Sequence, residues 1–165
     1  SLFPAGPLRE DPIRLIEMDY ILLNGADPRE IPYLTDINRV EMSSSITHAL
    51  PLHSRKGSKE KGRTLEEFKG QTIHAVAGIA YPENFFSMLE AYGINLIRHP
   101  FPDHYHYTIE DFRQMTQPIL MTEKDAVKCA ELPIKEGWVV PLKAELAPRF
   151  IKEIVEKIRA LGANR

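Results

Sequence analysis

The fold is decided by residues 72–97, which read TIHAVAGIAYPENFFSMLEAYGINLI. The first six, Thr72–Ala77, are almost continuously apolar before a glycine, as is typical of a buried strand. Pro82 then opens a helix, because proline is tolerated in a first helical turn, and Gly93 ends it. A second apolar run, Ile94–Ile97, follows at once. This order indicates two parallel strands joined by a crossover helix.

The same alternation continues toward the C-terminus. Two further apolar runs, Ile119–Met121 and Trp138–Leu142, are typical of strands. Thr108 and Thr122 are placed to cap helices, and a last helix with one apolar face is expected from about residue 147 to residue 161. Repeated alternation with short connections predicts an α/β fold. We expect three layers, α/β/α, with helices on both faces of a mostly parallel central sheet.

The N-terminal third is less regular. Leu8–Met18 is expected to form a short helix and Tyr20–Leu23 a buried strand. Residues 41–52 have alternating apolar positions and are interpreted as one strand. Thr64 and Glu67 have the spacing of a capping box, which predicts a short helix immediately after Thr64.

Length and composition indicate an ordinary globular protein. The 165 residues suffice for one domain with a real core, and 43% of them are hydrophobic and 27% charged. A net charge of −2 gives no field that favours nucleic acid. The single cysteine, Cys129, excludes an internal disulfide and is expected to be a small buried residue. No apolar run is long enough to span a bilayer. The chain starts at Ser1 without a signal-peptide pattern and is expected to be a fragment.

A basic run lies at about residues 54–63. Its lysines and arginines alternate with glycine and serine, which favours a flexible, solvated loop; contact with anionic lipid headgroups is the alternative. We expect residues 1–18 to form an interdomain connection with the first helix. Residues 19–165 are then expected to form one α/β/α domain that includes this loop.

The strongest candidate for chemistry is the segment Phe101–Tyr107, which follows the strand Ile94–Ile97. Asp103 and His104 are adjacent in it, and they are the candidate catalytic residues. An imidazole beside a carboxylate can accept a proton near neutral pH, and such folds place ligands at the carboxyl ends of strands. The alternative is a plain loop in which Asp103 caps the next turn and His104 is merely exposed.

Two weaker candidates are sites for anions or a metal–nucleotide. Thr122 and Lys124 stand where a strand passes into a helix, a position that favours anions, although simple helix capping explains them as well. Arg9 and Glu10 follow a Gly-Pro turn and suit a phosphate and a metal–water shell. An exposed ion pair is their alternative explanation.

The sequence contains no complete catalytic constellation. It has no Gly-x-x-x-x-Gly-Lys-Ser/Thr loop to bind phosphates and no Gly-x-Gly-x-x-Gly motif. Its histidines lack metal-ligand spacing, so no zinc is expected and no metal is expected to be held by this chain alone. If the sheet is parallel, Gly78, Phe101–Tyr107 and Thr122–Asp125 lie along one edge of it.

Four segments resemble the tetraacyldisaccharide 4′-kinase (lipid A 4′-kinase) family. They are Pro4–Glu10, His74–Ile79, Phe101–Tyr105 and Leu120–Cys129, which read PAGPLRE, HAVAGI, FPDHY and LMTEKDAVKC. The four come in the family's order, and the resemblance runs from residue 4 to about residue 143. One departure is Tyr81, where the family often has Asn.

The resemblance implies an enzyme of Gram-negative lipid A synthesis, peripheral to the cytoplasmic face of the inner membrane. It transfers the γ-phosphoryl group of ATP to the 4′-hydroxyl of a tetraacyldisaccharide 1-phosphate. The family has two α/β/α domains, and its P-loop lies in the N-terminal one. This chain is similar to the C-terminal domain, which implies that it lacks the P-loop because it is truncated and is inactive alone.

The resemblance also implies roles for single residues. His104 would lie near an Asp of the N-terminal domain that acts on the acceptor hydroxyl. Arg9 and Glu10 would approach the nucleotide and its metal, with ATP and Mg²⁺ held mainly by the absent domain. Two other interpretations stay open. One is a non-catalytic α/β module that binds an anionic ligand or a partner domain, and the other is a self-contained enzyme of unknown reaction.

Overall fold

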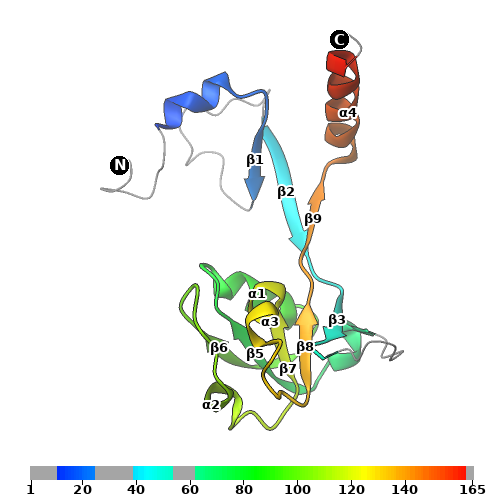
Figure 1. Ribbon diagram of the computed structural model, residues 1–165. Helices are drawn as coiled ribbons and strands as arrows, with labels where there is room; N and C mark the ends of the chain where they lie inside the picture. Colours follow the sequence, from blue (N-terminus) through cyan, green and yellow to red (C-terminus); the bar gives the residue numbers. More distant parts are fainter. Residues whose placement is uncertain (1–10, 25–38, 54–61, 163–165) are drawn as a thin grey trace. The chain divides into compact units, whose positions relative to one another are not determined.

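The computed structural model describes residues 11–24, 39–53 and 62–162. They form two compact units (Figure 1). The first contains the described residues up to Ser44 together with those from Ala144 onward, and the second is Ser45–Lys143. Residues 19–165, expected as one domain, thus contribute to both units. The proposed connection at residues 1–18 stays a prediction.

The first unit is a small parallel pair of strands with an added strand and two helical segments. The strand β1 pairs in parallel with β2, and β9 lies on the other side of β2. Tyr20 and Phe150 pack edge to face, with ring centroids 4.9 Å apart. The elements are η1 (Pro12–Glu17), β1 (Ile21–Asn24), β2 (Arg39–Ser45), β9 (Lys143–Leu146) and α4 (Pro148–Gly162).

Two features of the strands differ from the prediction. Residues 41–52, interpreted as one strand, belong to two strands of different sheets, because the chain leaves β2 after Ser45 and starts β3 at His48. Lys143–Leu146 was not predicted as a strand. It is an edge strand with three exposed residues, so its sequence lacks the apolar alternation that predicts a strand. Its pairing with β2 identifies it as a strand.

The second unit contains a six-stranded sheet in the order β4-β3-β8-β7-β5-β6. Four adjacent strands, β8, β7, β5 and β6, are parallel, and β3 and β4 extend the sheet in antiparallel pairing. The mostly parallel sheet predicted from the sequence is confirmed. The strands are β3 (His48–Pro51), β4 (Arg63–Thr64), β5 (Thr72–Ala77), β6 (Asn95–Pro100), β7 (Ile119–Thr122) and β8 (Gly137–Val140).

The basic run is only partly described. Residues 54–61 of the expected flexible loop lie outside the described residues. Arg63, which was counted in that loop, lies in β4 instead. Its guanidinium stands 4.9 Å from the ring centroid of Trp138, a cation–π contact that anchors this end of the run to the sheet.

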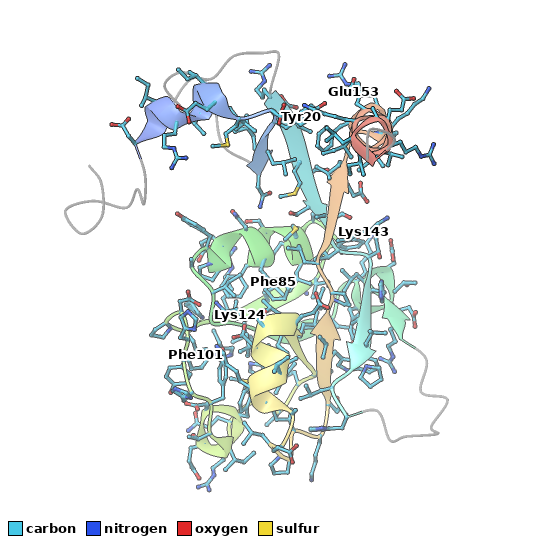
Figure 2. All side chains as sticks on the ribbon, turned by 45° about the horizontal axis from the view of Figure 1, so that its top comes forward. Tyr20, Phe85, Phe101, Lys124, Lys143 and Glu153 are labelled. Atoms are coloured by element: carbon cyan, nitrogen blue, oxygen red, sulfur yellow. The ribbon has the colours of Figure 1, made fainter. Side chains whose placement is uncertain are left out.

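Helices cover both faces of this sheet. Side chains of successive strand residues point to opposite faces, so neighbouring residues of β5 contact different helices. Ile73 and Ala75 of β5 lie in one core cluster with Phe85 of α1, around which Figure 2 shows side chains filling the space. Val76 lies in a second cluster with Cys129 of α3. The three-layer arrangement is thereby confirmed. The helical segments are η3 (Leu65–Phe68), α1 (Pro82–Glu90), α2 (Ile109–Phe112) and α3 (Glu123–Cys129).

Two short helical segments start with capping boxes. Thr64 and Glu67 form the predicted one before η3, and Thr108 and Asp111 form another before α2. Cys129 is buried as predicted, and burial raises the pKa of its thiol to about 12, which makes it a packing residue rather than a nucleophile.

The imidazoles of His74 and His99 form a partly buried polar chain across β5 and β6. Nδ1 of His74 lies 2.9 Å from Nε2 of His99, and Nε2 of His74 lies 2.8 Å from Oε1 of Gln117. His74 is 5% exposed, as expected for a core histidine with partners. One proton lies between the two facing ring nitrogens. If both rings were protonated, each nitrogen would carry a hydrogen and the two N–H groups would repel each other. Burial, and then His74, lower the pKa of His99.

This pair predicts a pH-dependent stability. Below pH 6.5, the ordinary pKa of the imidazole, His99 takes up a proton in the unfolded chain but stays neutral in the folded chain until its lowered pKa is reached. The unfolded state then binds more protons, so the free energy of unfolding falls as the pH decreases through this window. Above the window the contribution is complete. Urea unfolding at about pH 7.5 and about pH 5.5 measures the difference.

His99→Gln is expected to reduce that difference. His53→Gln, which removes an exposed imidazole, is the matched control. If His53→Gln flattens the pH dependence as much as His99→Gln, the contact between His74 and His99 is not its source.

Candidate functional site

The strand order of the parallel part of the sheet reverses between β5 and β7, which makes this the topological switch point of the sheet. β5 connects through α1 to β6 on one side, and β7 connects through α3 to β8 on the other. Folds of this kind bind ligands outside the carboxyl ends of the two strands at such a point. The segments beginning at Gly78 and Phe101 follow β5 and β6, and Thr122 ends β7, so their predicted common edge is confirmed.

His104 stands at this edge with its side chain 81% exposed. Its φ is 63°, and it is the one non-glycine residue with positive φ among those that the structure describes. The left-handed conformation costs about 1–2 kcal/mol. Such strain persists where surrounding contacts impose it, and it is frequent at functional sites. The imidazole is therefore accessible, and its backbone is held in an unfavourable conformation.

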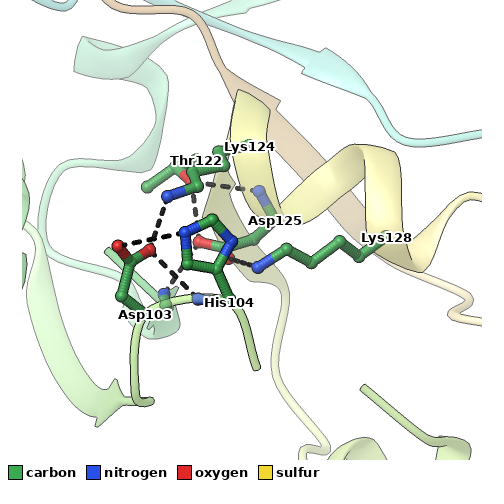
Figure 3. A network of polar contacts seen from close by, with 7 residues as sticks. Asp103, His104, Thr122, Lys124, Asp125 and Lys128 are labelled. Carbon is green, nitrogen blue, oxygen red and sulfur yellow. Dashed lines mark hydrogen bonds and ion pairs between the residues drawn. The ribbon is translucent and has the colours of Figure 1, made fainter. Parts of the chain in front are cut away.

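Asp103 fixes the loop beside it. Its Oδ1 accepts the main-chain N–H of His104 at 3.0 Å, and its Oδ2 lies 3.6 Å from Nε2 of His104 (Figure 3). Lys124 donates to Oδ1 at 2.5 Å. This hydrogen bond is the main cause that lowers the pKa of Asp103, and the charge of His104 adds to it. The carboxylate thus stays ionised at neutral pH and can orient the imidazole or stabilise its protonated form.

Thr122 and Lys124, the expected anion-binding residues, both have partners within the chain. The Thr122 hydroxyl accepts the N–H of Asp125 at 3.2 Å and donates to its Oδ2 at 2.6 Å. Lys124 is bound to Asp103, so an anion would have to compete with that carboxylate. Their anion-binding role stays a prediction, and the geometry favours capping and loop fixation.

Asp125 was not among the predicted site residues, yet it lies at the centre of this edge. It is fully buried, and its Oδ2 also accepts the main-chain N–H of Gly78 at 2.9 Å. A Cβ at Gly78 would lie 2.6 Å from the Tyr107 hydroxyl and 2.9 Å from Oδ1 of Asp125, so only glycine fits there. The available signal was the spacing Thr122-x-x-Asp125, which is that of a capping box.

The remaining expectations concern Arg9 and Glu10, metal binding, the membrane and Tyr81. Arg9 and Glu10 are outside the described residues. Within residues 11–24, 39–53 and 62–162, no three His, Cys, Asp or Glu side chains are grouped to hold a metal ion. None of the helices in those ranges is long and apolar enough to cross a membrane. Tyr81, the departure from the family pattern, is 76% exposed and gives α1 no side-chain cap.

Comparison with known proteins gives a consistent result. The model of the LpxK family, tetraacyldisaccharide-1-P 4′-kinase, matches residues 1–159. A tetraacyldisaccharide 4′-kinase of Xanthomonas oryzae pv. oryzae is 40% identical over 99% of this chain and 48% of its own length. That of Xylella fastidiosa is 42% identical over 97% of this chain and 46% of its own length. The chain spans about half the length of the curated relatives it matches.

One solved structure has the same fold. It is LpxK from Aquifex aeolicus, crystallised in complex with ATP, and it superimposes with a TM-score of 0.64 over 95% of this chain and 48% of its own. The sequence identity is 23%, so this likeness supports the fold alone. The matched region of the relatives is their C-terminal part.

Proposed function

The chain belongs to the tetraacyldisaccharide-1-P 4′-kinase family, and from this premise we propose that it is one half of a lipid A 4′-kinase. The complete protein would transfer the γ-phosphoryl group of ATP to the 4′-hydroxyl of a tetraacyldisaccharide 1-phosphate. The family match over nearly the whole chain carries the proposal. In it, an N-terminal P-loop half completes the enzyme, and the protein works at the cytoplasmic face of the inner membrane without spanning it.

The geometry of this half suits phosphoryl transfer, which depends mainly on positioning and on stabilising charge. His104 offers an exposed imidazole at the carboxyl edge of the sheet, and the ionised Asp103 holds it by backbone and side-chain contacts. In the proposal, the imidazole assists proton removal from the acceptor hydroxyl together with an Asp of the P-loop half. Closure of the two halves would exclude water, which otherwise competes with the hydroxyl.

Among the described residues, no three His, Cys, Asp or Glu side chains are grouped to hold a metal ion. Mg²⁺ normally neutralises developing charge on the phosphates of ATP. On the basis of the family match, we assign ATP and Mg²⁺ mainly to the P-loop half, with Arg9 and Glu10 approaching them. A nucleic-acid partner is not part of the proposal, given the net charge of −2.

The direct test uses the complete protein with γ-labelled ATP and a tetraacyldisaccharide 1-phosphate in detergent micelles. We expect label on the lipid, and none when the 4′-hydroxyl of the acceptor is blocked. Label released only as inorganic phosphate, or transferred equally to the blocked acceptor, would contradict the assignment of the 4′-hydroxyl as acceptor.

A further inference from the structure

The first turn of α3 contacts the loop that carries His104 at two separate points. At one point, Lys124 donates to Oδ1 of Asp103, immediately before His104. At the other, Oδ1 of Asp125 and the hydroxyl of Tyr107, three residues after His104, both lie next to Gly78, where they are the two atoms nearest to the position of a Cβ. The loop is therefore joined to α3 by the ion pair between Asp103 and Lys124 (Figure 3), and Tyr107 and Asp125 both pack around Gly78.

Asp125 is itself fixed by the strands around it. Its Oδ2 accepts from Gly78 at the end of β5 and from Thr122 at the end of β7. One carboxylate oxygen thus joins the two strands between which the sheet changes direction. Because Asp125 is fully buried, water does not compete for these hydrogen bonds, and their geometry is well determined.

The second oxygen of Asp125 faces a small group of buried polar atoms. Nζ of Lys128 lies 3.6 Å from Oδ1 and 5.6 Å from the ring centroid of Tyr107. Oδ1 of Asp125, Nζ of Lys128 and the hydroxyl of Tyr107 form no hydrogen bond within the described parts of the chain. Burial, and then the charge of Asp125, raise the pKa of Tyr107, which stays a neutral phenol. The carboxylate is the charge that balances the buried ammonium of Lys128.

The conformation of His104 is what these contacts have to maintain. A residue other than glycine leaves the left-handed conformation for an ordinary one unless its neighbours prevent it. Within the loop, the hydrogen bond from the His104 N–H to Asp103 favours the turn. Outside the loop, Lys124 fixes Asp103, and the carbonyl of Pro102 lies against Gly78, where a Cβ would be 3.4 Å from it.

We propose that Lys124 and Asp125 are positioning residues, which hold the loop against α3 and so keep His104 directed outward in its strained conformation. Neither touches substrate in this proposal, which gives Lys124 a different role from phosphate binding. The kinetic consequence of this positioning rests on the proposed function, because it concerns the reaction that His104 assists. Its structural consequence, the conformation of the loop, does not.

The kinetic test compares variants of the complete protein. Lys124→Gln and Asp125→Asn are each expected to lower kcat about tenfold or more, with the KM for ATP and for the lipid within about twofold. Lys124→Arg should restore most of the activity, because it keeps a charged donor to Asp103. Glu67→Gln, which weakens the capping box before η3, is the control for lost stability and should leave kcat unchanged.

The structural test uses amide hydrogen exchange in the same variants. Exchange at Gly78 should rise about tenfold or more in Asp125→Asn, and exchange at His104 should rise in Lys124→Gln, each while distant strand amides stay protected. Lys124 is 44% exposed on its side chain, so its replacement keeps the test decisive even if Asp125→Asn does not fold.

The outcomes separate the two hypotheses. If the wild type transfers no phosphate but exchange changes as expected, the proposed function fails and the positioning role stands. If Lys124→Gln raises a KM without lowering kcat, Lys124 binds a substrate and the positioning role is wrong for it. Unchanged kcat and unchanged exchange in Lys124→Gln, and in Asp125→Asn where it folds, would overturn the inference.

Discussion

Replacing His104 by alanine in the complete protein is expected to lower kcat by about 10²- to 10⁴-fold, the usual contribution of a positioned acid–base group. The imidazole is 81% exposed, and its Nε2 lies 3.6 Å from the ionised carboxylate of Asp103. Its loss therefore removes a proton acceptor without opening a cavity. ATP affinity should change less than about threefold, because in the proposal the P-loop half holds the nucleotide.

His104→Asn separates chemistry from backbone conformation. Asparagine tolerates the left-handed region almost as well as any residue except glycine, so the loop should keep its shape. It cannot accept a proton at neutral pH, so kcat should fall as far as in His104→Ala. If His104→Asn keeps wild-type activity, His104 serves the loop and not the reaction.

His106→Ala is the matched control for the same experiment. His106 is exposed and lies two residues further along the same loop. Its replacement is expected to leave kcat within about twofold of wild type. An unchanged kcat in His104→Ala, measured beside this control, would remove His104 from the mechanism.

The local features of the fold could be predicted from the sequence because each rests on a short-range signal. The strand Thr72–Ala77 is a mostly apolar run before glycine, and the capping box at Thr64 and Glu67 spans four residues. The three-strand arrangement of the first unit could not be predicted. It pairs β2, near the N-terminus, with β9, near the C-terminus, and the exposed residues of β9 give no periodic pattern.

The candidate site divides in the same way. Asp103 and His104 could be identified because a polar pair directly follows a predicted strand. Their support could not be predicted: Lys124 is 21 residues from Asp103 in sequence, and Asp125 is 47 residues from Gly78. Short polar side chains at helix starts usually cap the helix, so sequence alone favours that role for Asp125. Its full burial distinguishes it, and burial follows from the fold.

The largest effect is expected from the chain by itself, which should give no phosphorylated lipid when mixed with ATP and the disaccharide acceptor. In the proposed division of labour, ATP and Mg²⁺ are held by the P-loop half, and this sequence contains no Gly-x-x-x-x-Gly-Lys-Ser/Thr loop. His104 can assist the transfer only when the γ-phosphoryl group stands in line with the acceptor hydroxyl. Holding reactants in that geometry is worth effective concentrations of about 10⁵–10⁸ M in the best cases.

Supplying the P-loop half as a separate polypeptide tests this reasoning quantitatively. Covalent linkage normally provides an effective concentration in the millimolar range, so micromolar mixtures of the two halves should recover only a small part of the activity. The recovered rate should rise with the concentration of either half, and it should be lost when the added chain carries His104→Ala. Lipid phosphorylation by this chain alone, with ATP and no added half, would show that the reaction needs no second domain.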